Sequence, residues 1–267
     1  MLGDITLGQF YPTNSVVHKL DPRIKIVLAI VLIVGLFVAH SFYSYMVCVV
    51  FLAAAVILSK VPVSFIFKGL KPILFIMVFT AVINVFFTDG RILFKLGFVR
   101  VTYEGVIVAA TMVLRLFLLV TLTSLLTLTT SPIMLTDGIE NLLKPLKVIK
   151  VPAHEIAMMM TIALRFIPTL MEETDKIIKA QSARGADFTT GSLMSRAKAM
   201  IPILIPLFIS SFRRADELAT AMECRCYKGG DGRTKLKVLK LAPRDFIALG
   251  VVVMLIALII IFNIFAG

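Results

Sequence analysis

The sequence contains no phosphate-binding loop, because the pattern Gly-x-x-x-x-Gly-Lys-Ser/Thr occurs nowhere in its 267 residues. A process driven by ATP would therefore need a partner that binds the nucleotide. Cysteines are also few, and the three present, Cys48, Cys224 and Cys226, cannot build a disulfide framework. No histidine or further cysteine near Cys224 and Cys226 completes a four-ligand metal site, so we expect small half-buried thiols. We expect no metal, no cofactor and no catalysis by the chain itself.

Charged residues are scarce as well. They make up 16% of the chain, whereas 59% of the residues are hydrophobic and the mean hydropathy is +0.97. Soluble domains carry about 25% charged residues, so this composition indicates an integral membrane protein. The net charge of +12 does not call for a nucleic-acid partner, because basic residues beside membrane segments are explained by orientation and by anionic lipid.

Long apolar runs show where the chain crosses the bilayer. A spanning helix needs about 20 predominantly apolar residues, with a range of about 17 to 25. Five stretches meet this requirement: residues 24–39, 42–58, 72–87, 105–127 and 246–265. Only His40 and Ser41 separate the first two, which indicates a tight hairpin. We expect an all-α integral membrane protein with about five transmembrane helices.

Carboxylates are missing from all five stretches, since Glu104 and Asp245 lie only at their ends. This absence argues against a proton- or ion-coupled secondary carrier, which usually needs a carboxylate within the membrane. Arg115 lies near the middle of the fourth stretch, where a charge is costly. Two interpretations remain open for it: a functional role, or a structural role in which neighbouring hydroxyls satisfy the guanidinium.

The distribution of basic residues predicts the orientation. Lys19, Arg23 and Lys25 precede the first stretch, and 18 of the 28 lysines and arginines lie between residues 130 and 244. By the positive-inside rule, the N-terminus and this long segment are cytoplasmic. We therefore divide the chain into a membrane domain of four spans at 1–130, a cytoplasmic or interfacial domain at 131–244, and a final span at 245–267.

The segment 131–244 contains two apolar runs of 14 residues, 157–170 and 199–212, which are interrupted by arginine and proline. Runs of this length are usually buried or interfacial. Apolar residues recur at steps of three and four along these runs and continue beyond their C-terminal ends. This spacing predicts two long amphipathic helices at or below the membrane surface. A shorter amphipathic helix precedes them, with Ser131 as its N-cap and Pro132 at its first position.

Two arginine-bearing segments end these long helices. They read Gln-Ser-Ala-Arg-Gly-Ala-Asp at 181–187 and Ala-Met-Glu-Cys-Arg-Cys-Tyr at 221–227. One such arginine could simply complement the helix dipole, and Gly185 is a natural residue to end a helix. Two arginines spaced 41 residues apart, each at the end of a helix of similar length, favour docking on a partner, because a guanidinium suits bidentate contacts.

Four segments together resemble the transmembrane T component of energy-coupling factor (ECF) transporters: Leu-Arg-Phe-Ile-Pro at 164–168, Ala-Arg-Gly at 183–185, residues 214–219, and Ala-Met-Glu followed by Arg225 and Tyr227. The resemblance implies a vitamin or transition-metal importer of the prokaryotic cell membrane. In such importers the T component joins two cytosolic ABC ATPases to a membrane-embedded substrate-binding S component, through long coupling helices. The residues that the resemblance assigns to ATPase docking are Ala183, Arg184, Gly185, Glu223, Arg225 and Tyr227. Cysteines replace the alanine and the glycine of the second motif, so its backbone cannot rely on glycine at positive φ.

Three consecutive methionines, Met158, Met159 and Met160, begin the first amphipathic run. They form either an adaptable surface for the S component or the packing of the helix crossing. The acidic residues near Glu173 and the arginines near Arg214 could pair, but solvated faces are the safer interpretation. Three other functions remain as alternatives: the permease of an ordinary ABC importer, a secondary carrier, and a membrane scaffold without a transport role.

Overall fold

The computed structural model describes residues 10–96, 99–149, 152–186, 188, 192–229 and 239–266. The chain forms two compact units. We call Gly8–Gly138 with Val238–Gly267 the membrane bundle, and Met1–Leu7 with Ile139–Lys237 the helix-pair unit. Helix α5 (Pro132–Leu143) runs across the boundary between them.

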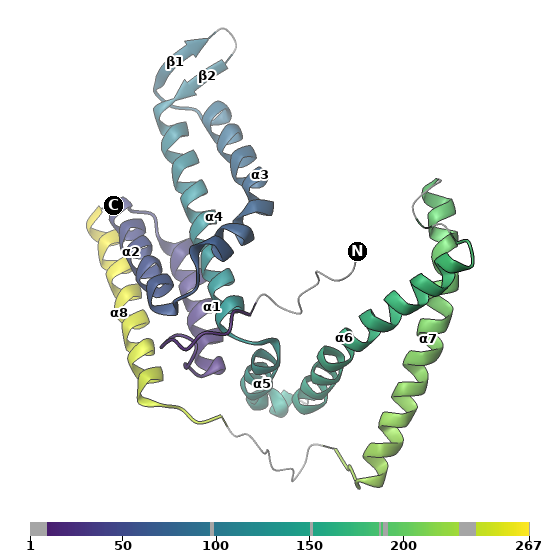
Figure 1. Ribbon diagram of the computed structural model, residues 1–267. Helices are drawn as coiled ribbons and strands as arrows, with labels where there is room; N and C mark the ends of the chain where they lie inside the picture. The colour runs from purple at the N-terminus through teal and green to yellow at the C-terminus, as the bar shows by residue number, and fades with distance from the viewer. Residues whose placement is uncertain are drawn as a thin grey trace. The chain divides into compact units, whose positions relative to one another are not determined.

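The membrane bundle contains five helices: α1 (Pro22–Val38), α2 (Phe42–Ser59), α3 (Val63–Phe87), α4 (Tyr103–Thr129) and α8 (Pro243–Ala266) (Figure 1). Each predicted span coincides with one of them, so the all-α membrane fold is confirmed. Helix α3 begins at Val63, well before the predicted residue 72, and it accommodates Pro72 in its interior.

Within the described ranges, five helices are long and apolar enough to cross a membrane: α2, α3, α4, α8 and residues Met194–Cys224 of α7. Helix α1 has 17 residues, which is at the lower limit of about 17 for a span. The number of candidates therefore agrees with the sequence-based prediction, whereas the membership differs. Helix α7, predicted to be interfacial, has the required length and composition.

Four helices of the bundle are arranged so that α1 and α2 each pack against both α4 and α8. Between them lies an apolar core that includes Leu36, Leu52, Leu118 and Ile259. Helix α3 packs along α4. The core is concentrated toward the α1–α2 hairpin, because Ala39 and Tyr45, on either side of that hairpin, belong to it.

Asn263 of α8 closes the hairpin between α1 and α2. Its side-chain oxygen accepts hydrogen bonds from the backbone N–H groups of His40 and Ser41, both at 3.2 Å, and from Ser44 Oγ at 2.9 Å. Its amide nitrogen donates to the Val38 carbonyl at 2.7 Å. One amide thus satisfies polar groups at the end of α1 and at the start of α2.

A short antiparallel β-hairpin connects α3 and α4, whereas an all-α chain was expected from the sequence. Strand β1 (Ile92–Leu96) pairs with β2 (Val99–Thr102), with Ile92 opposite Thr102 and Leu96 opposite Val99, and the register shifts between Ile92 and Phe94. At the base of the hairpin, Thr102 caps α4 by accepting a hydrogen bond from the Gly105 N–H at 3.1 Å.

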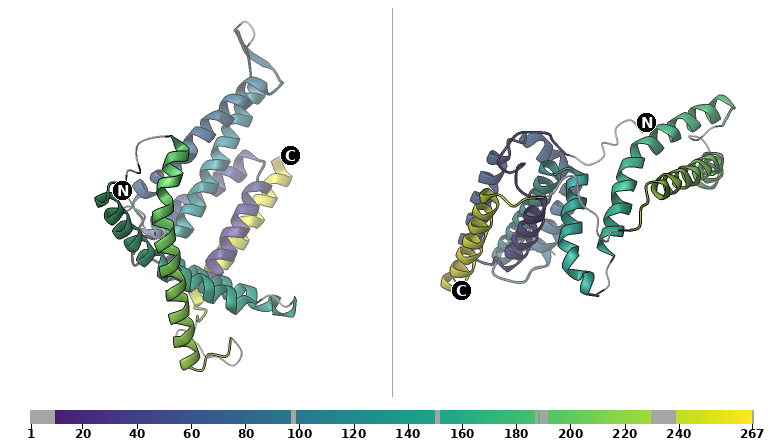
Figure 2. Two further views of the ribbon diagram at one scale, coloured as in Figure 1. Left: turned by 90° about the vertical axis from the view of Figure 1, so that its right-hand side faces the viewer. Right: turned by 90° about the horizontal axis from the view of Figure 1, so that it is seen from below.

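The helix-pair unit is built from the 3-10 helix η1 (Lys144–Ile149) and the long helices α6 (Ala153–Ala183) and α7 (Leu193–Cys224). Figure 2 shows α7 crossing α6. These helices have 31 and 32 residues, so each is roughly 45 to 50 Å long. The two predicted amphipathic helices are confirmed, and so is the Ser131 cap of α5, since Ser131 Oγ accepts a hydrogen bond from the Met134 N–H at 3.4 Å.

Candidate functional site

The first candidate docking point is the C-terminal end of α6. Ala183 is the last helical residue, Arg184 caps the helix, and Gly185 adopts a φ of +88°. The Gly185 N–H donates to the Ser182 carbonyl and the Ala186 N–H donates to the Gln181 carbonyl, both at 3.0 Å. This pair of hydrogen bonds is a Schellman motif, which satisfies the last carbonyls of a helix. Asp187, the last residue of the first arginine-bearing segment, lies outside the described residues.

The end of α7 repeats this geometry with a different sequence. Arg225 caps the helix, and Cys226 adopts a φ of +55°. The Cys226 N–H donates to the Glu223 carbonyl at 2.8 Å, and the Tyr227 N–H donates to the Met222 carbonyl at 3.0 Å. Each step of the hydrogen-bond pattern therefore corresponds to one at the end of α6, and the two arginines occupy equivalent positions.

The residue after the arginine distinguishes the two helix ends. Gly185 adopts the left-handed conformation without a steric penalty, and no atom lies within 4 Å of the position that a Cβ would occupy. Cys226 adopts the same conformation with a β-carbon, which costs about 1 to 2 kcal/mol. The second motif lacks the glycine, as expected, and Cys226 adopts the strained left-handed conformation in its place. The end of α7 therefore keeps the same hydrogen-bond pattern as the end of α6.

Both arginines are exposed, and among the described residues neither makes a side-chain hydrogen bond or an ion pair. An exposed arginine held on an ordered helix cap offers five N–H donors in a fixed fork. Such a group is suited to a carboxylate or to backbone carbonyls of another protein. Cys224 and Cys226 are exposed too, which corrects the expectation of half-buried thiols.

Contacts between α6 and α7 show that the helices run antiparallel. Arg214 Nη2 of α7 donates to Glu173 Oε2 of α6 at 2.5 Å. Beyond the end of α7, Tyr227 Oη lies 3.5 Å from Nε2 of His154, which is in the first turn of α6. The start of α6 is thus next to the end of α7, so Arg184 and Arg225 lie at opposite ends of the pair, on the order of 45 Å apart.

His154 connects the end of α7 to α5 as well. Its Nδ1 atom lies 3.3 Å from Oε1 of Glu140, and the Glu140 side chain is buried. Sequence analysis assigned no role to His154. The sequence gives little indication of this role, because only the tertiary arrangement brings the imidazole between Glu140 and Tyr227.

The crossing of α6 and α7 leaves polar atoms unpaired. Sequence analysis favoured solvated charges at this point, and the Glu173–Arg214 ion pair shows that this was wrong for these two residues. Among the described residues, Ser210 Oγ and Arg214 Nη1 are buried without a hydrogen-bond partner. Both residues line a cavity of about 450 Å³, together with Glu173, Pro206, Ile209, Arg213 and Glu217. A buried polar group without a partner is costly, so these two atoms lower the stability of the crossing.

An apolar surface lies along the outside of α7. Its members are each at least half exposed: Met200, Ile201, Ile205, Phe208, Ile209 and Phe212. On α6, the side chains of Met159 and Met160 are 59% and 37% exposed, and Met158 is half-buried. Large apolar surfaces of this kind mark contacts with lipid or with another protein.

Arg115 belongs to the membrane bundle. Its Nε and Nη2 atoms donate to Tyr45 Oη at 3.0 and 2.6 Å, and Nη2 also donates to the Ala39 carbonyl at 3.3 Å. The guanidinium also lies over the rings of Phe37 and Tyr45, 5.9 and 5.8 Å from their centroids. Ala39 caps α1, so Arg115 ties the middle of α4 to the end of the shorter helix. This arrangement supports a structural role, although the hydroxyl that binds the guanidinium belongs to Tyr45 of α2 and not to a neighbour of Arg115 in the sequence.

Candidate metal ligands do not gather in the described part of the chain, where no group of three or more His, Cys, Asp or Glu residues could hold an ion. The two cysteines beside Arg225 therefore have no further ligands among the described residues.

Comparison with known proteins gives concordant results. The sequence profile of the CbiQ family, described as cobalt transport protein, matches residues 13–236. The chain is 57% identical over 260 residues to the energy-coupling factor transporter transmembrane protein EcfT of Ruminiclostridium cellulolyticum, covering 97% of each chain. It is 62% identical over 250 residues to the EcfT of Clostridium kluyveri, covering 93% of each. Over 261 residues it is 48% identical to the EcfT of Bacillus subtilis, covering 97% of this chain and 98% of the relative.

Proposed function

The chain belongs to the family of energy-coupling factor transporter transmembrane proteins, and on that premise we propose that it couples two cytosolic ABC ATPases to a small substrate-binding S component. It is a multi-pass membrane protein of a transport system, and its relatives are transporter membrane subunits. In the proposed complex the ATPases hydrolyse ATP, and the chain transmits their movement to the S component for uptake of a vitamin or another micronutrient.

One observation carries the docking proposal: two exposed arginines lie on helix ends of the same geometry, at opposite ends of an antiparallel pair. A capping role alone does not require this match between Arg184 and Arg225. A separation on the order of 45 Å suits two ATPases, each engaging one arginine. Ala183 and Gly185 shape the first point, and Glu223 and Tyr227 shape the second.

The apolar surface of α7 and the three methionines at residues 158–160 supply the second half of the proposal. Methionine is unbranched and polarizable, so it adapts to partners of different shape. The exposure of Met159 and Met160 supports a role as S-component contacts over the packing of the helix crossing.

Orientation is part of the same proposal. Basic residues precede α1 and are frequent between α4 and α8, which by the positive-inside rule places the N-terminus and the helix pair in the cytoplasm of a prokaryotic cell. The permease of an ordinary ABC importer is the main alternative. It is disfavoured because such a permease docks through one short helix, whereas this chain has two helices of 31 and 32 residues.

Charge reversal at the two arginines tests the function. Truncating a charge-assisted interface contact costs about 2 to 5 kcal/mol, so we expect Arg184→Glu and Arg225→Glu each to weaken ATPase association, and the double variant to abolish uptake. ATPase pull-down and uptake of a radiolabelled vitamin measure the two effects.

Lys176→Glu is the matched control, because Lys176 is an exposed cation within α6 that lies about two turns before the capping Arg184. It introduces the same change in charge and should leave ATPase binding and uptake intact. Uptake at the normal rate by the double arginine variant would refute the docking proposal.

A further inference from the structure

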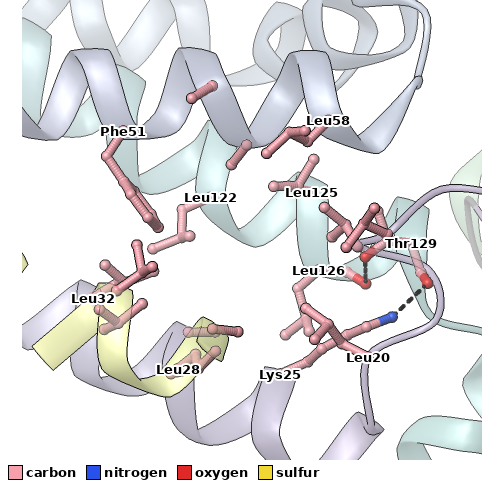
Figure 3. Close-up of a pocket in the computed structure, with 18 of the residues that line it drawn as sticks. Leu20, Lys25, Leu28, Leu32, Phe51, Leu58, Leu122, Leu125, Leu126 and Thr129 are labelled. Atoms are coloured by element: carbon pink, nitrogen blue, oxygen red, sulfur yellow. Dashed lines mark hydrogen bonds between the residues drawn. The ribbon is translucent and has the colours of Figure 1, made fainter. Parts of the chain in front are cut away.

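The membrane bundle is hollow at one end. A cavity of about 400 Å³ lies between α1, α2, α4 and α8 (Figure 3). The apolar core that includes Leu36, Leu52, Leu118 and Ile259 fills the half of the bundle near the α1–α2 hairpin. The cavity occupies the other half, beside Lys25 at the start of α1 and Arg244 at the start of α8, which we call the basic end.

The sequence explains why this half is not filled. Four alanines line the cavity where larger side chains could have met: Ala29 of α1, Ala54 and Ala55 of α2, and Ala248 of α8. Leucines from α1 and α4 face the space from opposite sides, with Leu28 and Leu32 on one side and Leu122 on the other (Figure 3). Small residues on three helices thus leave this space unfilled.

A space of this size and lining is built for an apolar occupant. Protein interiors are close-packed, and each unfilled volume lowers stability in proportion to its size. Water is a poor occupant, because it needs two to four polar partners, and the lining is almost wholly hydrocarbon. Binding sites for small molecules measure about 300 to 1,000 Å³, so this cavity lies within the range of a ligand site.

The exposure of its lining shows where the cavity opens. Leu58 of α2 and Ile247 of α8 line it and are 55% and 67% exposed. The opening therefore lies between the end of α2 and the start of α8, on the outside of a bundle whose exposed residues face the hydrocarbon of the bilayer. Membrane lipid is the apolar material that reaches this opening.

The cations at the basic end differ in their availability. Lys25 Nζ already donates to the Thr129 carbonyl at 2.9 Å, to Thr130 Oγ1 at 3.1 Å and to the His18 carbonyl at 3.2 Å. Arg244 lines the cavity, is exposed, and makes no side-chain hydrogen bond or ion pair with the described residues. Its guanidinium is free to bind an anion at the mouth.

We propose that this cavity is a binding site for one acyl chain of an anionic phospholipid, whose phosphate head group binds Arg244. The occupant follows from the hydrocarbon lining, the opening onto the bilayer and the free cation at the basic end. The lipid completes the packing of α1, α2, α4 and α8, and it anchors the bundle at the leaflet next to its basic end.

The chain contains no tryptophan, so a single introduced indole reports on the cavity. Phe51→Trp places it in the lining, and Val50→Trp, at a residue that is 63% exposed, places it on the lipid-facing surface of the same helix. The full chain is reconstituted in phosphatidylcholine with increasing amounts of chain-brominated phosphatidylglycerol. We expect half-maximal quenching of Phe51→Trp at a brominated fraction about tenfold lower than for Val50→Trp.

Two further variants separate the chain pocket from the head-group contact. Ala55→Leu, added to Phe51→Trp, fills the cavity and should remove the early quenching, whereas Ala53→Leu, on an exposed residue of the same helix, should retain it. Arg244→Gln should remove the preference for brominated phosphatidylglycerol over brominated phosphatidylcholine. Quenching of Phe51→Trp that follows the bulk lipid composition, or that is absent, overturns the site. Equal quenching of the unchanged Arg244 protein by both brominated lipids overturns the anionic head group.

Discussion

In the membrane bundle, buried or half-buried cations donate hydrogen bonds to several acceptors. In the helix-pair unit, by contrast, the two arginines that cap the long helices donate no side-chain hydrogen bond to the described residues. Lys25 donates to three oxygens, and Arg115 donates to a phenol and a carbonyl. Arg184 and Arg225 have no side-chain partner among the described residues. Both buried polar atoms that lack a partner in the described chain, on Ser210 and Arg214, belong to α7.

The difference indicates which unit satisfies its own buried polar groups. In the described part of the bundle every buried side-chain polar atom has a hydrogen-bond partner, as a membrane fold requires. An antiparallel pair with exposed apolar residues and unused donors has its missing contacts on other molecules. We therefore expect the bundle to hold the chain in the membrane and the helix pair to bind partners.

Replacing Lys25 gives the largest expected effect on the bundle. Hydrogen bonds from a charged group contribute about 1.5 to 3 kcal/mol each, and Lys25→Met removes three and leaves the Thr129 carbonyl short of a donor. We expect the bundle to lose about 3 kcal/mol or more, seen as a lower apparent Tm in detergent. Lys19→Met, at an exposed residue, should change the Tm little, and an unchanged Tm for Lys25→Met would show that the network is not structural.

The methionines test the other side of the comparison. Changing Met158, Met159 and Met160 together to valine keeps the surface apolar but stiffens it at χ1. If this surface binds S components, we expect some of them to lose about tenfold in affinity more than others, while ATPase binding persists. Co-purification with several S components measures the difference. Loss of every partner together with instability in detergent would assign the methionines to packing instead.

The helices could be predicted because a spanning helix requires a long apolar run, which is a local property of the sequence. The spans of α2, α4 and α8 and the cap at Ser131 all follow from residues within a few turns of each other. The start of α3 at Val63 was missed because Lys68 and Lys71 interrupt its first turns. The β-hairpin was missed because its two strands have only 5 and 4 residues.

The candidate site was predictable to a similar degree. The positions of Arg184 and Arg225 at helix ends, and of Gly185 after α6, were predictable because helix-ending signals are local, whereas the role of the two arginines in docking stays a prediction. The partners of charged groups were not identified, since Tyr45 for Arg115 and Glu173 for Arg214 depend on which helix faces meet. Such pairings are fixed by tertiary packing, which a single sequence does not display.

The two helix ends permit a matched pair of substitutions with opposite effects. Gly185→Ala puts a β-carbon at a φ of +88° and should destabilise the end of α6 by about 1 kcal/mol, whereas Cys226→Gly relieves a φ of +55° and should stabilise the end of α7 by up to about 1 kcal/mol. Amide hydrogen exchange of the last helical turns measures both. Equal effects of the same sign would mean that the left-handed residues do not set these ends.

The smallest expected effect is a pH dependence of the bundle through His18. Its Nε2 lies 2.9 Å from the Tyr11 carbonyl, an acceptor only, so in the neutral ring Nε2 carries the proton, and Nδ1 accepts from Ser15 Oγ at 2.7 Å. Burial, aided by the charge of Lys25, lowers the pKa of His18 below its ordinary value of 6.5. Folding therefore favours the neutral ring.

The stabilisation from His18 is fully present above pH 6.5 and is lost as the pH falls through the lowered pKa of the folded protein. The loss should be small, because the ring is partly exposed and screened by solvent. We expect the apparent Tm of the unchanged protein to fall more between pH 7.5 and pH 5 than that of His18→Gln, while His40→Gln, at an exposed histidine, follows the unchanged protein. A His18→Gln variant with the full pH dependence would place the titrating group elsewhere in the bundle.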